Sequence, residues 1–428
     1  MLRKLLMVVL VIGFMAGMVG TAKADEVSEL KLQLAEQAEL LKQMQLRLEQ
    51  LETQQGMQEQ QMEQQIAKAV EDKQVAALPD SLKWAEKVKL YGDFRYRHEH
   101  IDAESDGGHD NNGRDRHRIR ARVGVKAQIN DEWAFDLRLA SGSSDAANST
   151  NQTLDDAWAE DDLWIDRAYL KYTPLCLDDW TFLFGKMGNP FYKPGGSQLL
   201  WDGDANPEGI AFSYETKLND NTGFFANGGG MWMEEQSSDV DTFLWGLQGG
   251  LKHTFDSGDK LTWGAGAFKY GNIKDEAILS SAEGNSTSGG NYLYDYELVE
   301  LFGEYGTKLG NLPLSVYGDY VVNTASKVKE DTGWLVGTKL GKVKDPGTWD
   351  MGYEYRDSEK DSVVGMFTDS DFVDGGAEGK GHKFSIGYGL AKNTKLGFTY
   401  FLTERDAGGN DKRDDKYQRM QFDLSVKF

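Results

Sequence analysis

The 428-residue chain has one cysteine, Cys176, and only seven prolines. A single cysteine excludes an intrachain disulfide, a cysteine-based metal site and the CxxCH motif of a c-type haem protein. Beyond its N-terminal segment the chain has no apolar run as long as a helical membrane span, which needs about 18 residues. Positive charge is also scarce, and the net charge of −22 argues against a nucleic-acid partner. Glycine and aromatic residues are abundant, as is typical of strands and turns.

The first 24 residues have the pattern of a secretory signal peptide. Arg3 and Lys4 precede the apolar core Leu5–Val19, and Ala22-Lys23-Ala24 forms an A-x-A cleavage site. We therefore expect the mature chain to begin at Asp25. A membrane anchor is the alternative, which the short core disfavours.

Residues 25–75 are rich in Glu, Gln, Leu and Met and contain no proline. Apolar residues recur with the heptad spacing of a left-handed coiled coil. They are Val27, Leu34, Leu41, Leu48, Met62 and Ala69 at one core position, with Leu30, Met44 and Leu51 at the other. We expect a periplasmic oligomerisation stalk, followed by a linker over residues 76–86. A lone charged helix is the alternative.

From residue 87 onward the sequence repeats the two-residue alternation of strands. In Arg116–Ile129, one face carries four arginines, and the other carries apolar side chains from Ile119 onward. A strand between hydrocarbon and an aqueous lumen accommodates that pattern. Sixteen such strands are expected, beginning near residues 87, 114, 132, 162, 180, 208, 222, 241, 260, 297, 312, 332, 348, 380, 394 and 416.

The connections between these strands alternate between short turns and mostly long polar loops, which is typical of an outer-membrane barrel. The predicted fold is all-β: a 16-stranded antiparallel transmembrane β-barrel over residues 87–428, preceded by an α-helical coiled coil. Apolar faces are expected outside, with charged faces inside. A soluble sandwich or propeller is the alternative, but its inward faces would be apolar.

The connection Gly188–Gly209 differs from the other loops, because it holds three prolines and five large apolar side chains. Such a loop packs against a surface, and we expect it to fold into the barrel. It would then present Asp202, Asp204 and Glu208 to the pore. A loop packed over a rim or a neighbouring subunit is the alternative.

The acidic segment Asp369–Asp374 is expected in a solvated loop.

A basic side of the constriction is expected opposite this acidic loop. Its members are Arg95, Arg120, Arg122, Arg138, Arg167 and Lys186. Acid facing base across water creates a transverse field that favours polar solutes. Arg116 and Arg118 extend the series into a possible anion ladder. The alternative is that all these arginines only solvate the wall and pair locally.

Neither an enzyme nor a metal site is expected. None of the six histidines accompanies a serine in a nucleophile motif. His98, His100 and His109 lie near one rim, where solvated histidines are the ordinary case. No EF-hand spacing occurs, and no cofactor is expected.

Four segments resemble a family of Gram-negative outer-membrane porins. They are KLYGDFRYRHE, RHRIRARVGVKAQINDEWAFDLRLASGS, DLWIDRAYLKYTP and FGKMGNPFYKPGGSQLLWDGDANPEGIAF, together with the terminal aromatic. The resemblance implies a trimeric diffusion channel in the outer membrane, surrounded by lipid and lipopolysaccharide. It also implies a C-terminal signal for the barrel-assembly machinery, formed by Phe422, Leu424, Val426 and Phe428.

The sequence thus predicts a porin for small hydrophilic solutes and ions. The first alternative is a substrate-specific channel for an anion. The second is a tether whose coiled coil grips peptidoglycan while the barrel is a plug.

Overall fold

A computed structural model describes residues 80–103, 113–142, 147–279, 283–406 and 414–428, together with the isolated positions Gln43 and Arg47. The chain divides into two units, residues 1–82 and 83–428. The predicted signal peptide and, apart from those two positions, the predicted coiled coil lie outside the described residues. Part of the expected linker forms the 3₁₀ helix η1 (Asp80–Lys87), which leads into the first strand. Among the described residues, no helix has the length and apolarity to cross a membrane.

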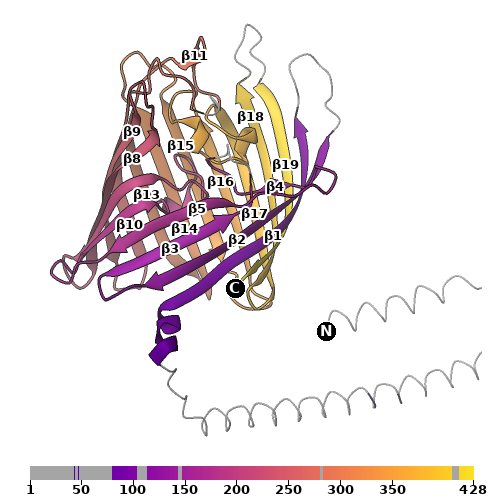
Figure 1. Cartoon of the computed structure of the whole chain (residues 1–428). Coiled ribbons are helices and arrows are strands. Elements are labelled where there is room, and N and C mark those ends of the chain that lie inside the picture. Colours follow the sequence, from indigo (N-terminus) through magenta and orange to yellow (C-terminus); the bar gives the residue numbers. More distant parts are fainter. Residues whose placement is uncertain are drawn as a thin grey trace, which may run out of the picture. The chain divides into compact units, whose positions relative to one another are not determined.

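The second unit is a closed antiparallel barrel (Figure 1). Its sixteen long strands in the described part of the chain are β1 (Val88–Ala103), β2 (Arg114–Gln128), β3 (Trp133–Ala140), β5 (Trp164–Tyr172), β6 (Trp180–Lys186), β7 (Glu208–Lys217), β8 (Thr222–Glu234), β9 (Thr242–Thr254), β10 (Lys260–Gly271), β13 (Tyr296–Leu309), β14 (Leu312–Asn323), β15 (Thr332–Gly341), β16 (Trp349–Ser358), β17 (Gly379–Ala391), β18 (Thr394–Asp406) and β19 (Asp414–Lys427). Three two-residue strands lie in the loops: β4 (Gln152–Thr153), β11 (Thr287–Ser288) and β12 (Asn291–Tyr292).

Closure joins the first strand to the last. β19 pairs with β1 in a register from Asp93 opposite Lys427 to Ala103 opposite Tyr417. The predicted sixteen-stranded barrel is thereby confirmed. Predicted and observed strand starts differ most at β5 and β19, by two residues each (162 against 164, and 416 against 414).

Alternation places apolar side chains outside and polar ones inside along β1 and β2. Leu90 and Phe94 are exposed on the outer surface, whereas Arg97 and Glu99 are buried inside. An apolar outer face of this kind is typical of a barrel surrounded by lipid.

The inner faces of β8–β15 depart from this pattern. They carry buried apolar side chains, namely Phe225, Met231, Leu244, Phe268, Tyr296, Leu298, Tyr317, Val321 and Leu335. The prediction of charged inner faces throughout the barrel therefore holds only in part for this half of the wall, where Glu300 and Asp319 are buried among the apolar side chains. The reason is that loops fold inward and give these side chains a dry surface to pack against.

Candidate functional site

The loop over residues 188–207 packs on the inner wall through its aromatic side chains. The rings of Phe191 and Trp201 lie 4.9 and 5.6 Å from the ring of Phe268, measured between centroids. At Gly195 (φ 57°) a Cβ atom would lie 2.3 Å from the ring of Tyr317. Only glycine fits this close approach in a left-handed conformation. The loop therefore contacts both β10 and β14 and occupies the apolar half of the lumen.

A second loop, over residues 359–378, also enters the lumen. It contains the 3₁₀ turns η3 (Gly365–Phe367) and η4 (Phe372–Asp374). Its peptide groups join the first loop: Asp202 N–H donates to the Phe367 carbonyl (2.6 Å), and Ser370 N–H donates to Asp202 Oδ2 (3.0 Å). A long polar loop was expected at this place in the chain, but its course into the lumen was not predicted from the sequence.

The missed signal was the same one that identified residues 188–209. The second loop also has several large apolar side chains, of which Val363, Val364, Phe372 and Val373 are buried. The expectation of a solvated acidic segment at Asp369–Asp374 is wrong in this respect, because Asp369 is only 5% exposed.

Most of the predicted basic residues lie together on the other half of the wall. Asp93 forms ion pairs with Arg120 (2.9 Å) and Arg122 (2.8 Å). On β3, Arg138 donates to Asp166. On β5, Arg167 donates to Asn206 Oδ1 at 2.8 Å.

The acidic loop touches this wall at Asp204 as well as at Asn206. Asp204 Oδ1 forms an ion pair with Arg122 at 2.8 Å, and Thr150 Oγ1 donates a hydrogen bond to Asp204 Oδ2 at 2.7 Å. Asp202 lies deeper, between the two loops. The acid and base that sequence placed on opposite sides are thus in contact here, so Asp204 connects the loop to the wall.

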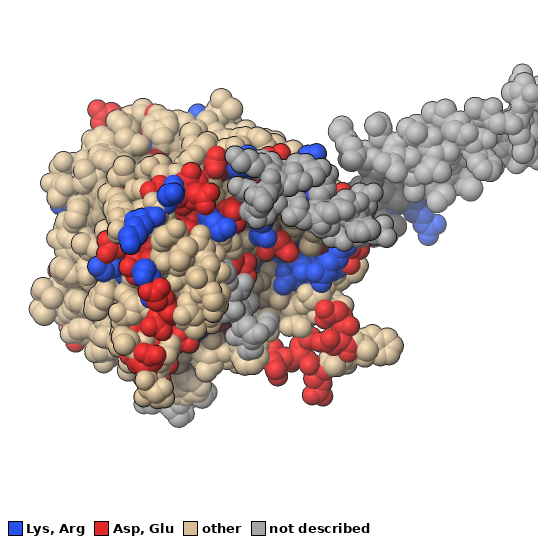
Figure 2. Space-filling view, turned by 90° about the horizontal axis from the view of Figure 1, so that it is seen from above, with Lys and Arg blue, Asp and Glu red and all other residues tan. Residues whose placement is uncertain are grey.

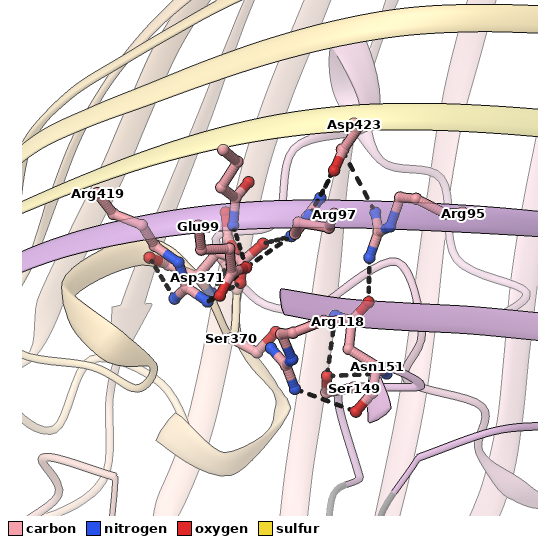
Figure 3. Close-up of polar contacts among 12 residues, drawn as sticks. Arg95, Arg97, Glu99, Arg118, Ser149, Asn151, Ser370, Asp371, Arg419 and Asp423 are labelled. Carbon is pink, nitrogen blue, oxygen red and sulfur yellow. Dashed lines mark hydrogen bonds and ion pairs between the residues drawn. The ribbon is translucent and has the colours of Figure 1, made fainter. Parts of the chain in front are cut away.

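Beside this wall is a buried ionic cluster that sequence reasoning did not identify as a site (Figure 3). Glu99 of β1 is fully buried and accepts from Arg419 of β19 (3.0 and 3.1 Å), from Arg116 of β2 and from Arg97 (3.3 Å). Asp371 of the second loop pairs with both Arg97 and Arg419 at 2.9 Å. The cluster therefore joins three strands at the barrel closure to the inward loop.

Figure 2 shows Lys, Arg, Asp and Glu side chains gathered in a central band at this end of the barrel, with mostly uncharged residues to its left. A closed barrel with inward loops and a charged wall is the architecture of a channel. The family model described as "Putative porin" matches residues 108–312 and 291–428. The chain belongs to this porin family. It forms an outer-membrane channel for small solutes, and this prediction is confirmed.

One solved structure has a similar barrel, and a second gives a weaker match. OprB of Pseudomonas putida, solved at high pH, matches over 80% of this chain and 95% of its own, with 11% identity and a TM-score of 0.54. DcaP, an outer membrane channel of Acinetobacter baumannii, matches over 80% of this chain and 97% of its own, with 16% identity and a TM-score of 0.45. No curated protein matches the chain. The family and fold are those of non-enzymatic channels.

Two predicted members of the constriction lie outside the lumen of this porin. Lys186 and Glu208 pair with each other at 2.5 Å on the neighbouring strands β6 and β7. They share the outward parity of Phe184 and Ile210, and Ile210 is half-exposed. Their assignment to the constriction is therefore wrong, because it followed their nearness to the loop instead of the two-residue period.

The remaining predicted residues have definite places. Arg116 pairs with Glu99, whereas Arg118 donates to the backbone carbonyl of Asn151 at 3.1 Å. The predicted assembly signal lies on the outer face, with Phe422, Leu424, Val426 and Phe428 all exposed. His98 and His100 lie 3.7 and 3.0 Å from Asp115, and His109 is outside the described residues. Among described residues, no cluster of three ligating side chains could hold a metal ion.

The loop carboxylates titrate differently because their neighbours differ. Burial, with the nearby charges of Asp369 and Asp204, raises the pKa of Asp202 to about 8. Burial also acts to raise the pKa of Asp204, but Arg120 and Arg122 outweigh it and hold that pKa below its usual value. Asp202 is therefore protonated at pH 7 and Asp204 is ionised.

This difference makes the packing of the two loops pH-dependent. The packed state retains a proton on Asp202 between pH 3.8, the ordinary pKa, and about 8. Its stabilisation is complete below that window and is lost as the pH rises through it, by at most about 1.4 kcal/mol per pH unit. We expect protease cleavage of residues 188–207 to accelerate between pH 5 and 8. In Asp202→Asn the cleavage rate should not change with pH over this range. Asp256→Asn, a control in an exposed turn, should show the same pH dependence as wild type. If the cleavage rate of Asp202→Asn rises with pH as steeply as that of wild type, Asp202 is not the titrating group.

Proposed function

We propose that the porin conducts small hydrophilic solutes and ions by passive diffusion along the charged half of its lumen. The observation that carries this proposal is the division of the interior. The loop over residues 188–207 packs on the inner faces of β10 and β14, whereas β1, β2 and β19 keep charged side chains inside. Water and ions follow the charged surface, because an apolar surface does not replace their hydration.

The arginine wall sets the ion preference in this proposal. Asp93 and Asp204 supply two carboxylates to Arg120 and Arg122, so replacing both arginines with Ala leaves two negative charges beside the path. In planar bilayers with a KCl gradient, we expect the wild-type protein to give discrete conductance steps. The double variant should move the reversal potential toward cation preference. Lys252→Ala, which removes one inward-facing positive charge on β9, is the control; if it shifts the reversal potential by half as much as the double variant, Arg120 and Arg122 have no special role.

We further propose that the functional unit is a trimer in the outer membrane. The coiled-coil prediction over residues 25–75 supports a periplasmic stalk that bundles three chains, and the family resemblance supports the trimer. Lipopolysaccharide would surround the apolar outer face. A peptide of residues 25–75 that sediments as a monomer would remove the stalk from this proposal. The tether to peptidoglycan remains an alternative that predicts no conductance at all.

The C-terminal residues are proposed as the signal for the barrel-assembly machinery. Phe428 exchanges two backbone hydrogen bonds of 3.1 Å with Gly92, and its ring is largely exposed. Deleting Phe428 should therefore lower the yield of folded barrel in the outer membrane several-fold and affect the stability of the folded fraction only slightly. Immunoblots of unboiled membrane samples measure this yield. Leu390→Ala, another exposed outer-face residue, should leave the yield unchanged, and a normal yield after deletion contradicts the signal.

A further inference from the structure

Two arginines of the lumen wall lack a carboxylate of their own. Arg95 of β1 and Arg118 of β2 are diagonal neighbours, because the register pairs Arg95 with Arg120 and Arg97 with Arg118. The carboxylate nearest to Arg95 is Asp423 at 3.9 Å, and both oxygens of Asp423 already accept from Arg97 at 2.6 and 2.8 Å. No described carboxylate forms an ion pair with Arg118. The adjacent arginines are paired: Arg97, Arg116, Arg120 and Arg122 each have a carboxylate within 3.3 Å.

One neutral residue bonds to both of these arginines (Figure 3). The Asn151 side-chain oxygen accepts from Arg95 Nη2, and its backbone oxygen accepts from Arg118 Nη2 at 3.1 Å. Asn151 is itself oriented by Ser149, whose hydroxyl oxygen accepts from the Asn151 amide at 3.2 Å. The buried Nε atoms of Arg95 and Arg118 have no hydrogen-bond partner among the described residues. Two guanidinium groups thus share two neutral oxygens and keep unused donors.

We infer that Arg95 and Arg118 form a binding site for a small oxyanion, a carboxylate or a phosphate, that passes along the lumen. This inference rests on the proposed solute path through the charged half. The oxygens of Asn151 occupy positions that anion oxygens would take. Bonds from a guanidinium to a charged oxygen are about twice as strong as bonds to a neutral one, and the planar fork of arginine matches an oxyanion. An entering anion therefore displaces the Asn151 side-chain oxygen from Arg95 and accepts from the donors that the two guanidinium groups leave unused.

The test uses inorganic phosphate as the probe in planar bilayers. Phosphate added to KCl at constant ionic strength should reduce the single-channel current of the wild-type porin in a saturable manner. Arg95→Gln and Arg118→Gln should each raise the phosphate concentration that blocks half of the current about tenfold or more, because each variant loses one charge-assisted hydrogen bond to the anion. Lys126→Gln removes an exposed inward charge from the same face of β2 and should leave the block unchanged.

Asn151→Ala separates a binding role from a structural one. Removing the competing side-chain oxygen should lower the half-blocking phosphate concentration, the opposite sign to the arginine variants. If Asn151→Ala and Arg118→Gln weaken the block alike, the residues only support the wall and the inference is overturned. It is also overturned if phosphate blocks wild type, Arg95→Gln and Arg118→Gln equally, or does not block wild type. A wild-type protein without conductance steps in KCl would instead refute the proposed diffusion path.

Discussion

Glu99→Ala is expected to destabilise the barrel by about 3–5 kcal/mol, the largest effect of any single charge removal we predict. Glu99 is fully buried and is shared by Arg97, Arg116 and Arg419. Its loss leaves three guanidinium groups at the closure of the barrel, with Asp371 and Asp423 as the remaining nearby carboxylates. The urea midpoint for loss of the folded, heat-modifiable band in gels measures the change.

An exposed carboxylate provides the control for Glu99. Glu215 pairs with Lys252 at 2.6 Å, but its side chain is 66% exposed and its partner is 42% exposed. Water screens that pair, so Glu215→Ala should cost less than about 1 kcal/mol. Glu99→Gln keeps an acceptor without the charge and should fall between the two. Equal urea midpoints for the Glu99 and Glu215 alanine variants would contradict the importance of the buried cluster.

Trp201→Ala is expected to release the loop over residues 188–207 and to enlarge the conducting path. The Trp201 side chain is 5% exposed and packs on Phe191, Phe268 and Phe367. Truncating a buried tryptophan costs about 3–5 kcal/mol, and here the cost falls mainly on the docking of the two loops because Phe367 belongs to the second one. Single-channel conductance should therefore rise and become noisier.

Trp158 offers a matched control in another loop. Its side chain is fully exposed, so Trp158→Ala removes the same atoms without opening a cavity. Conductance and protease sensitivity of residues 188–207 should stay at the wild-type level. If Trp201→Ala also leaves conductance unchanged, the loop does not limit the path.

The docked loops explain why the lumen has two unlike halves. Loop backbone that leaves water must find hydrogen-bond partners, and the two loops supply them to each other and to the wall. Asn285, in the connection between β10 and β13, donates to the carbonyls of Lys360 and Val363 at 2.8 Å, and Tyr296 of β13 donates to Asp361 at 2.8 Å. The apolar side chains of the first loop, with Val363 and Val364 of the second, complete the core on β8–β15, whereas Phe372 and Val373 pack with Phe401 of β18.

Local alternation was sufficient to predict the barrel. The side-chain period of two is a property of each strand, so Arg116–Ile129 by itself separates a wet face from a lipid face. Short turns and long loops then order the strands around the barrel. The same period, applied strictly, would have placed Lys186 with Phe184 and Glu208 with Ile210 on the outer face.

The sequence by itself determined the strands, their faces and the inward tendency of an apolar loop, because these depend on residues that are neighbours in the chain. Only the tertiary structure decided which charges neutralise one another. Arg97 and Asp371 are 274 positions apart, and Arg419 and Glu99 are 320 apart. Such pairs form only when closure brings β1 beside β19 and the second loop folds between them, and no local pattern encodes which carboxylate reaches which guanidinium. The same closure leaves Arg95 and Arg118 with a neutral partner, because each nearby carboxylate is already bound to another arginine.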